Sequence, residues 1–386
     1  MTQRLFDENA YRFAFTAVVR GCEKTADDRY AVLLDGTCFF PEAGGQGADK
    51  GTLGGHPVLD VREVGDEIVH TLPAPLAVGS AVEGTVDRNC RFRRMQQHTG
   101  EHILSGLAHR FFGCENVGFH LGEDEVTMDF DRPLSDADME RLEEAANRCV
   151  WENQPVRAWY PAPDELSDLT YRSKKELTGA VRIVEIEGVD RCACCAPHVA
   201  RTGEVGAVSV LSYARYKGGM RLFIACGEDA YRDLCRKRAQ LRNISHLLSA
   251  EITACDKATE ALFAAGAEQR RKISALQKQL LDLRIATAAP QDGMILFFAD
   301  DGDAEAARRF VNGCLPRCEK LCACFTGADG ETYRFVIACR DGDLTALAAA
   351  FRTVLGAKCG GSPKMICGSV SASEEQIRSC LRSAVL

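Results

Sequence analysis

The sequence predicts an α+β protein built from several domains. Its 386 residues exceed the usual size of one domain, so two or three domains are expected. Hydrophobic residues make up 46% of the chain, which is enough for several cores. Along the chain, short β-like runs give way to mixed helices and strands, then to a glycine-poor helical stretch and a final mixed unit.

Residues 1–88 are predicted to form a small β-rich, barrel-like domain. Its β-like runs lie at residues 30–34, 67–70 and 81–86. Residues 36–51 are typical of a strand, a glycine-rich turn and a polar exit, in which Gly44 and Gly45 permit positive φ and close approach of the backbone to a ligand. Taken alone, this segment is explained by a β-turn or bulge in a small sheet.

Residues 89–226 are predicted to form an α+β domain that holds the functional site. A helix is expected at its start, capped by Asp87 and ended by Gly113. His98 and His102 stand four residues apart, so they share one helix face and can reach one ion. The other elements expected here are a helix at 138–153 and strands at 181–186 and 205–225.

Cys194 and His198 offer a second pair of metal ligands later in the same domain. Together with the helical pair they make a His, His, Cys, His set that suits tetrahedral zinc. The spacing alone also fits two histidines at a polar helix rim and an ordinary cysteine among nineteen. Cys192 and Cys195 flank Cys194 as competing ligands, and the spacing to His198 favours Cys194.

Three segments, taken together, resemble one family. They are residues 37–46, 98–104 and 190–198, the last followed by Thr-Gly-Glu-Val-Gly at 202–206. In order and approximate spacing they resemble the motifs of alanyl-tRNA editing proteins of the AlaX type, the free-standing relatives of the alanyl-tRNA synthetase editing domain. The chain departs from the pattern at Ala43, where the family has glycine, and at 195–197, where Cys-Ala-Pro replaces Gly-Gly-Thr. The resemblance covers residues 1 to about 226.

This resemblance implies a trans-editing hydrolase that deacylates mischarged tRNA(Ala). Its chief substrate would be Ser-tRNA(Ala), with Gly-tRNA(Ala) as a further candidate. One Zn²⁺ per chain would be held by His98, His102, Cys194 and His198. The net charge of −8 is unusual for a nucleic-acid-binding protein, but an enzyme that holds one end of a tRNA needs only local basic clusters, such as residues 91–94.

The resemblance also implies roles for residues around the metal. The Thr37 hydroxyl would bond the hydroxyl of the serine substrate, as the matching threonine is thought to do in the family. The backbone at Gly44 and Gly45 would stabilise the developing oxyanion, and Gln46 would position substrate or water. Glu101 points about 100° round the helix from the mean direction of the ligands, which makes it the least favoured catalytic candidate.

Two other functions fit parts of the sequence. His98-x-x-Glu101-His102 matches the inverted zinc-protease motif, with Glu101 as general base and Glu176 as a third ligand. A protease, however, has no need of Cys194, His198 or the segment 37–46. A non-catalytic RNA-binding or dimer-forming protein with structural zinc is the other alternative, because four protein ligands resemble a closed structural site.

Residues 227–288 are predicted to form a long coiled-coil helix or an antiparallel helical hairpin. Two apolar series support this: Leu234, Leu241 and Leu248 stand seven apart, and Ile273, Leu276, Leu280 and Leu283 follow 3-4-3 spacing. Gly266 is a possible break. These apolar positions need a partner surface, so we expect a homodimer, or packing within a hairpin.

Residues 289–386 are predicted to form a separate α/β domain that follows a linker at 289–293. Strands are expected at 294–299, 320–325 and 333–339, and helices at 303–312, 344–355 and 371–385. The element order and the segment Gly-Gly-Ser-Pro-Lys-Met at 360–365 resemble the DHHA1 domain of alanyl-tRNA synthetases. Four cysteines in this domain, Cys314, Cys318, Cys322 and Cys324, form no clean Cys-x2-Cys pair and are interpreted as ordinary core residues.

The sequence also predicts a cytoplasmic location without a membrane partner. It has no run of eighteen apolar residues, so no transmembrane helix is expected. The first residues lack the apolar stretch of a signal peptide. An odd number of cysteines, nineteen, without compact framework spacing is typical of a reducing compartment.

Overall fold

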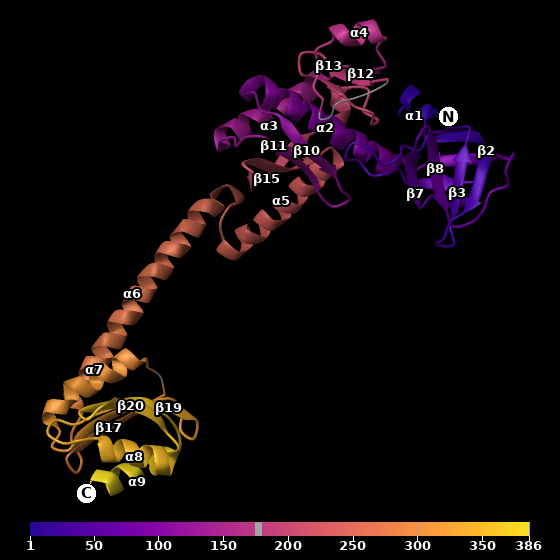
Figure 1. Cartoon of the computed structure of the whole chain (residues 1–386). Helices are drawn as coiled ribbons and strands as arrows, with labels where there is room; N and C mark the ends of the chain where they lie inside the picture. The colour runs from indigo at the N-terminus through magenta and orange to yellow at the C-terminus, as the bar shows by residue number, and fades with distance from the viewer. Residues whose placement is uncertain (174–179, 301, 386) are drawn as a thin grey trace. The chain divides into compact units, whose positions relative to one another are not determined.

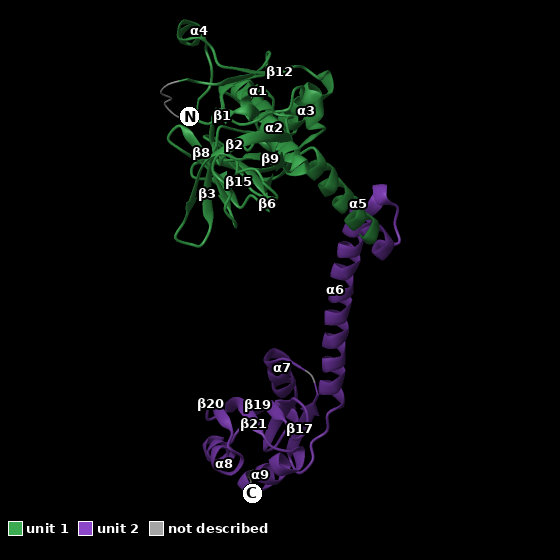
Figure 2. Cartoon of the chain, turned by 90° about the vertical axis from the view of Figure 1, so that its right-hand side faces the viewer, with its two compact units in different colours: residues 1–243 green, residues 244–386 purple. Residues whose placement is uncertain are grey.

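The computed structural model of the chain describes residues 1–173, 180–300 and 302–385. The chain divides into two compact units, Met1–Asn243 and Ile244–Leu386 (Figure 2). None of the described helices is long and apolar enough to cross a membrane. Both units combine helices with sheets, which confirms the α+β class.

A curled, seven-stranded antiparallel sheet opens the first unit (Figure 1). In spatial order its strands are β6 (His56–Pro57), β5 (Gly51–Leu53), β9 (Ala81–Val86), β2 (Ala14–Lys24), β3 (Tyr30–Leu34), β8 (Glu67–Leu72) and β7 (Asp60–Val64). A short parallel pair, β1 (Gln3–Arg4) and β4 (Gly36–Thr37), flanks α1 (Leu5–Glu8). The strands expected at 30–34, 67–70 and 81–86 are all present, because their side chains alternate between a buried and an outer face.

The rest of the first unit is built around α2 (Arg88–Phe112). As predicted, the Asp87 side chain caps this helix by accepting from two backbone N–H groups, and Gly113 ends it at φ 59°. The surrounding helices are α3 (Asp136–Glu152), α4 (Pro163–Asp168) and the 3-10 turn η1 (Thr202–Val205). One sheet has the order β10 (Asn116–Leu121), β11 (Val126–Phe130), β16 (Gly219–Cys226), β15 (Val208–Tyr216). A second has β12 (Val156–Trp159), β13 (Ile183–Ile186) and β14 (Asp190–Ala193).

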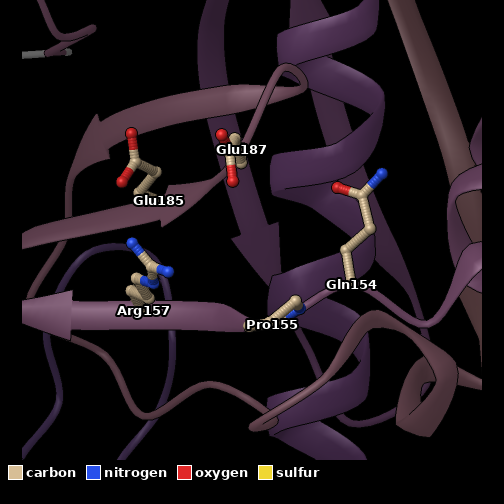
Figure 3. Close-up of a pocket in the computed structure, with 5 residues that line it drawn as sticks. All are labelled: Gln154, Pro155, Arg157, Glu185 and Glu187. Atoms are coloured by element: carbon tan, nitrogen blue, oxygen red, sulfur yellow. The ribbon is translucent and has the colours of Figure 1, made fainter.

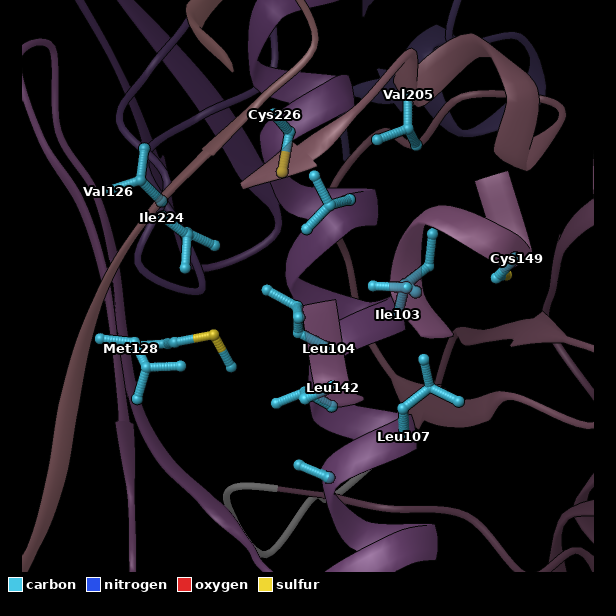
Figure 4. Packing of buried hydrophobic residues seen from close by; sticks show 14 of the residues in the cluster. Ile103, Leu104, Leu107, Val126, Met128, Leu142, Cys149, Val205, Ile224 and Cys226 are labelled. Carbon is cyan, nitrogen blue, oxygen red and sulfur yellow. The ribbon is translucent and has the colours of Figure 1, made fainter. Parts of the chain in front are cut away.

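A single hydrophobic cluster holds these elements to α2. Ile103, Leu104 and Leu107 of the helix belong to one buried cluster with Leu142 of α3 and Met128 of β11 (Figure 4). Burial of such aliphatic side chains stabilises a fold by roughly 1.5–3 kcal/mol each. The packed face of α2 therefore fixes its rotation, and with it the direction in which the helical histidines point.

A buried ion pair joins α2 to the segment that precedes β5. Arg91 and Asp49 are both fully buried, and Arg91 Nε donates to Asp49 Oδ2 at 2.9 Å. Arg91 Nη2 also donates to the carbonyl of Cys38 at 2.6 Å, while Asp49 accepts from the Phe40 N–H at 2.8 Å. The glycine-rich segment is thus held against the first turn of α2 at both of its ends.

The helical span begins with α5 (Glu228–Leu248), within which the two units meet in the sequence. After the 3-10 turn η2 (Ile252–Ala254), α6 runs over Cys255–Thr287. The helix does not break at Gly266, which the sequence offered as a possible break. It continues through this residue, because a single glycine costs only about 1 kcal/mol relative to alanine. Exposed side chains on α6 include all four of the 3-4-3 series, namely Ile273, Leu276, Leu280 and Leu283.

A five-stranded sheet forms the core of the second unit. Its order is β17 (Met294–Ala299), β18 (Leu321–Thr326), β19 (Thr332–Ala338), β21 (Met365–Ser371) and β20 (Lys358–Ser362), with only β17 and β18 parallel. One face packs on α7 (Ala304–Cys314), which the 3-10 turn η3 (Leu315–Arg317) follows, and the other on α8 (Thr345–Leu355) and α9 (Glu374–Val385). The four cysteines singled out above lie in the buried cluster beneath α7.

A buried histidine in the first sheet makes the stability of the fold depend on pH. His70 Nε2 lies 2.8 Å from the Thr37 hydroxyl, and its Nδ1 lies 3.3 Å from the Val32 carbonyl oxygen. Burial lowers the pKa of His70 to about 4 from its ordinary value of 6.5. The unfolded chain therefore binds this proton first, so the contribution of His70 to stability is complete above about pH 6.5 and is lost as the pH falls towards 4.

We expect His70→Gln to flatten this dependence. Between pH 6.5 and 4 the parent should lose up to about 3 kcal/mol more unfolding free energy than the variant, as measured by urea denaturation at a series of pH values. Parallel curves for the two proteins would show that His70 is not held neutral in the folded state.

Candidate metal centre

Four side chains from two segments converge on one point in the first unit. His98 and His102 come from the middle of α2, while Cys194 and His198 come from the segment that follows β14. Their ligand atoms all lie within 4.8 Å of one another. This arrangement brings together the four residues predicted as ligands.

The spacing of these atoms suits a small tetrahedral ion. Cys194 Sγ lies 3.6 Å from His98 Nε2 and 3.4 Å from His198 Nε2. In a tetrahedron with metal–ligand bonds of about 2.0–2.3 Å, neighbouring ligand atoms are about 3.5 Å apart. The four residues therefore can hold a metal ion with little rearrangement.

Each histidine uses its other ring nitrogen to bind a protein group. His98 Nδ1 lies 2.9 Å from Gln46 Oε1, His102 Nδ1 lies 2.8 Å from Asp190 Oδ2, and His198 Nδ1 lies 3.0 Å from the Thr99 hydroxyl. A ring whose Nδ1 donates a hydrogen bond leaves Nε2 as the electron-pair donor. These three partners therefore turn the three Nε2 atoms toward the centre.

The electrostatics of the centre favour a thiolate at Cys194. Burial opposes ionisation of this thiol, but the neighbouring imidazoles of His98 and His198 outweigh it and hold the pKa of Cys194 well below its ordinary value. Burial alone dominates at Cys192 and Cys195 and raises the pKa of each to about 11. The preference for Cys194 over its two neighbours, inferred from spacing, thus has an electrostatic basis.

An arginine that sequence reasoning missed completes the support of His102. Arg172 Nε donates to Asp190 Oδ1 at 2.7 Å, on the oxygen opposite the one that binds His102. Burial favours the neutral form of Asp190, but the bonds with His102 and Arg172 keep the pKa of its carboxyl below the ordinary value. The carboxylate is therefore fixed on both sides and holds the ring of His102 in one orientation.

A cavity of about 610 Å³ adjoins the four ligands. Its wall includes the ligands His98, His102 and Cys194 together with Gly44 and Gly45 of the glycine-rich segment. Such a volume lies within the range of small-molecule sites. A smaller cavity of about 160 Å³, lined by Gln154, Pro155, Arg157, Glu185 and Glu187, contains none of the predicted site residues (Figure 3).

The two glycines form the tip of a tight turn against the cavity. The backbone N–H of Ala43 and that of Gln46 each donate to the carbonyl of the other, and Gly44 and Gly45 have φ of 59° and 83°. Successive positive φ values are typical of a type I′ turn, which glycine adopts without strain. A Cβ on Gly45 would lie 2.3 Å from the Phe119 carbonyl oxygen, whereas one on Gly44 would meet nothing within 4 Å.

Two other predicted site residues, Gln46 and Thr37, do not line this cavity. Gln46 is buried behind the turn and holds His98, and within the described residues its Nε2 has no hydrogen-bond partner. Thr37 is also buried, does not line the cavity, and binds His70 and the Phe39 N–H through its hydroxyl. A contact between Thr37 and a substrate stays a prediction.

Glu101 reaches the cavity although it is off the ligand face of α2. Its Oε2 lies 3.9 Å from His102 Nε2, and its Oε1 accepts from Ser105 and Asn116. Glu101 can line the cavity from this helical position because a glutamate side chain is long enough to bend toward the neighbouring face. Its catalytic role stays a prediction. Glu176, the third ligand of the protease alternative, lies outside the described residues.

Known proteins resemble this chain over most of its length. The model of a family described as threonyl and alanyl tRNA synthetase second additional domain matches residues 181–224, which include Cys194 and His198. An alanine–tRNA ligase of Ignicoccus hospitalis is 30% identical over 323 residues, which cover 80% of this chain and 35% of the ligase.

Two free-standing editing proteins are also similar. The alanyl-tRNA editing protein Aarsd1-B of Xenopus laevis is 31% identical over 281 residues, which cover 69% of this chain and 66% of that protein. The alanyl-tRNA editing protein Aarsd1 of Danio rerio is 34% identical over 192 residues, or 49% of this chain and 47% of that protein. The chain thus spans about a third of the ligase and about two thirds of the Xenopus protein.

The geometry predicts a graded loss of metal in three variants. Cys194→Ser should abolish stoichiometric binding, because it removes the thiolate. Arg172→Ala should weaken binding by about 10- to 100-fold, because it frees the carboxylate that orients His102. Arg191→Ala is a matched control, because Arg191 lies next to Asp190 on β14 but its side chain binds Glu185, and this variant should bind metal as the parent does. Competition with a chelator of known affinity measures all three.

The same titration addresses the protease alternative. Glu176→Gln should keep its metal if the four convergent residues are the ligands. Metal loss in Glu176→Gln together with retention in Cys194→Ser would contradict the assignment and favour the protease motif.

Proposed function

Because the chain belongs to the family of alanyl-tRNA editing proteins, which is related to the editing region of alanyl-tRNA synthetase, we propose that it hydrolyses mischarged tRNA(Ala), chiefly Ser-tRNA(Ala). Gly-tRNA(Ala) is a further candidate substrate. The observation that carries this proposal is the convergence of three imidazoles and one thiol beside a cavity that a glycine turn borders.

The reaction is attack of water on the ester carbonyl that joins the amino acid to the terminal ribose. The water oxygen bonds to the carbonyl carbon, the ester C–O bond breaks, and a proton lost by the water passes to the leaving ribose oxygen, which gives free serine and a ribose hydroxyl. Negative charge develops on the carbonyl oxygen in the transition state. Groups that stabilise this oxygen lower the barrier most.

The glycine turn supplies donors suited to this oxyanion. Within the part of the chain that the structure describes, the N–H groups of Gly44 and Gly45 have no hydrogen-bond partner. Gln46 holds His98 from behind the turn through Oε1 and keeps its side-chain NH2 group for substrate or water. Glu101, fixed by Ser105 and Asn116, is our candidate to accept the proton of the attacking water.

One zinc ion per chain suits the ligand set, because three imidazoles and one thiolate match zinc's preference for tetrahedral nitrogen and sulfur ligands. Zinc would supply positive charge that polarises the substrate or braces the pocket. Because all four ligands come from the protein, the side chains around the cavity decide which of these two roles zinc would have.

The partner we propose is tRNA(Ala) carrying a wrong amino acid. A non-catalytic RNA-binding protein with structural zinc would need no cavity beside the metal, whereas this chain has one. A protease would not explain why Cys194 and His198 lie at the same point as the helical histidines. Both observations support the editing reaction over the two alternatives.

Deacylation of tRNA(Ala) charged with serine, glycine or alanine tests the proposal. The metal-loaded protein should release serine at least tenfold faster than alanine and should leave a casein substrate intact. A site that engages the serine hydroxyl penalises the analogue without it by roughly 1–3 kcal/mol. Cleavage of casein without release of serine would identify a protease, and inactivity in both assays would identify a binding protein.

Thr37→Val in the same assay tests the predicted contact with serine. We expect the ratio of serine to alanine release to narrow by about tenfold, with metal content unchanged. This role requires the Thr37 hydroxyl to leave His70 when substrate binds. A variant with an unchanged ratio and lower stability would assign Thr37 to the fold and move discrimination elsewhere.

A homodimer formed through α6 is a further part of the proposal. The exposed 3-4-3 series on this helix offers an apolar stripe, which a second copy would cover. Light scattering of the intact chain should give twice the mass of one chain, and Leu276→Glu combined with Leu280→Glu should reduce it to one. A single-chain mass for the parent at high concentration would exclude the dimer.

A further inference from the structure

The proposed reaction leaves most of the cavity without an occupant. A seryl group has about six water-sized atoms at roughly 30 Å³ each, so it would fill less than a third of the 610 Å³. The remaining space can admit a part of the substrate that does not depend on the amino acid. In an aminoacyl-tRNA that part is the terminal nucleoside, an adenosine.

An aromatic side chain at the mouth of the cavity is suited to this part. Tyr160 follows β12, lines the cavity and is 47% exposed. Its hydroxyl donates to Asp7 Oδ2 at 2.9 Å. Asp7 Oδ1 lies 3.5 Å from Arg182 Nε, and Arg182 Nη1 donates to the carbonyl of Cys194 at 3.1 Å. A chain of polar contacts therefore fixes the ring relative to a metal ligand.

The hydroxyl of Tyr160 already binds Asp7, so the aromatic ring is the part of this side chain that can contact a substrate. Burial and the neighbouring Asp7 raise the pKa of Tyr160 to about 12, so the phenol stays protonated and keeps donating. The two arginines of the wall are already compensated, since Arg4 pairs with Glu63 and Arg182 with Asp7. A substrate group at the mouth of the cavity would therefore stack on the ring of Tyr160 rather than pair with an arginine.

We propose that Tyr160 is a stacking platform for the terminal adenine of the tRNA, so that this end of the cavity is a purine-nucleoside subsite. The assignment rests on the proposed function, because the acyl group is taken to lie at the metal end. Base–aromatic stacking tolerates any base and needs only an exposed ring held at a fixed angle. The contacts of Tyr160 meet both requirements.

Kinetics on two substrates test the subsite in the intact, metal-loaded chain. Tyr160→Ala should raise KM for Ser-tRNA(Ala) about tenfold, which corresponds to about 1.4 kcal/mol, with kcat within about twofold. Tyr160→Phe should stay close to the parent because it keeps the ring. On serine ethyl ester, which has no nucleoside, both variants should match the parent.

Tyr213→Ala is the matched control. Tyr213 is 37% exposed, and its hydroxyl donates to Asp136 at 2.8 Å, but it does not line the cavity. This variant should behave as the parent on both substrates. An unchanged KM in Tyr160→Ala, or an equal loss on the tRNA and on the ethyl ester, would overturn the subsite.

Equilibrium dialysis with adenosine 5′-monophosphate separates failure of the subsite from failure of the proposed function. The parent should bind the nucleotide at millimolar concentration, and Tyr160→Ala should bind it about tenfold more weakly. Failure of the parent to release serine would reject the editing reaction, while nucleotide binding that depends on Tyr160 would still support the subsite. Absent binding, or binding that is equal in the parent and Tyr160→Ala, would reject the subsite even if serine is released.

Discussion

The buried ion pair between Arg91 and Asp49 is the constraint on which the arrangement of the site depends. Arg91 lies on the same helix as His98, two turns earlier, and Asp49 lies just beyond the glycine turn. The pair fixes the position of the glycine turn along the axis of α2, so that the Gln46 side chain can reach His98. Removing Asp49 would leave the buried guanidinium of Arg91 without its acidic partner and cost about 3–5 kcal/mol. The register between the first sheet and α2 is therefore strongly specified.

Once α2 is placed, the three candidate histidine ligands are oriented by groups outside the candidate ligand set. Gln46, Thr99 and Asp190 each take one Nδ1 atom, so the three imidazoles present Nε2 to the same point. Two of these groups are supported in turn, Asp190 by Arg172 and Thr99 by the Val199 N–H. A centre supported in this way is organised before a metal ion or substrate arrives, which reduces the cost of ordering it on binding.

Local signals in the sequence predict the ends of α2 and the shared face of its two histidines. A capping aspartate, a left-handed glycine and two histidines four residues apart all act within one helix, so their consequences follow from helix geometry. The strands β20 and β21 were missed because Gly-Gly-Ser-Pro is typical of a loop. The hydrogen bonds that make β21 a strand come from both of its neighbours, β19 and β20.

Local sequence patterns do not predict which side chains of distant segments will meet. Arg172 with Asp190, Arg91 with Asp49, and Tyr160 with Asp7 join charged or polar side chains that chain folding alone brings together. The motif order gives the family, but it does not show that the Thr37 hydroxyl faces His70. Side-chain length also matters, since Glu101 lies off the ligand face of α2 but its long side chain bends toward the cavity.

We propose that three imidazoles and the single thiolate of Cys194 surround one metal ion. X-ray absorption at the zinc edge of the metal-loaded protein tests this most directly, because it counts sulfur and nitrogen neighbours separately. We predict one sulfur at about 2.3 Å and three nitrogens at about 2.0–2.1 Å. Two or more sulfurs would bring Cys192 or Cys195 into the centre, and a shell of two nitrogens with oxygens would replace Cys194 altogether. Either result would contradict the account.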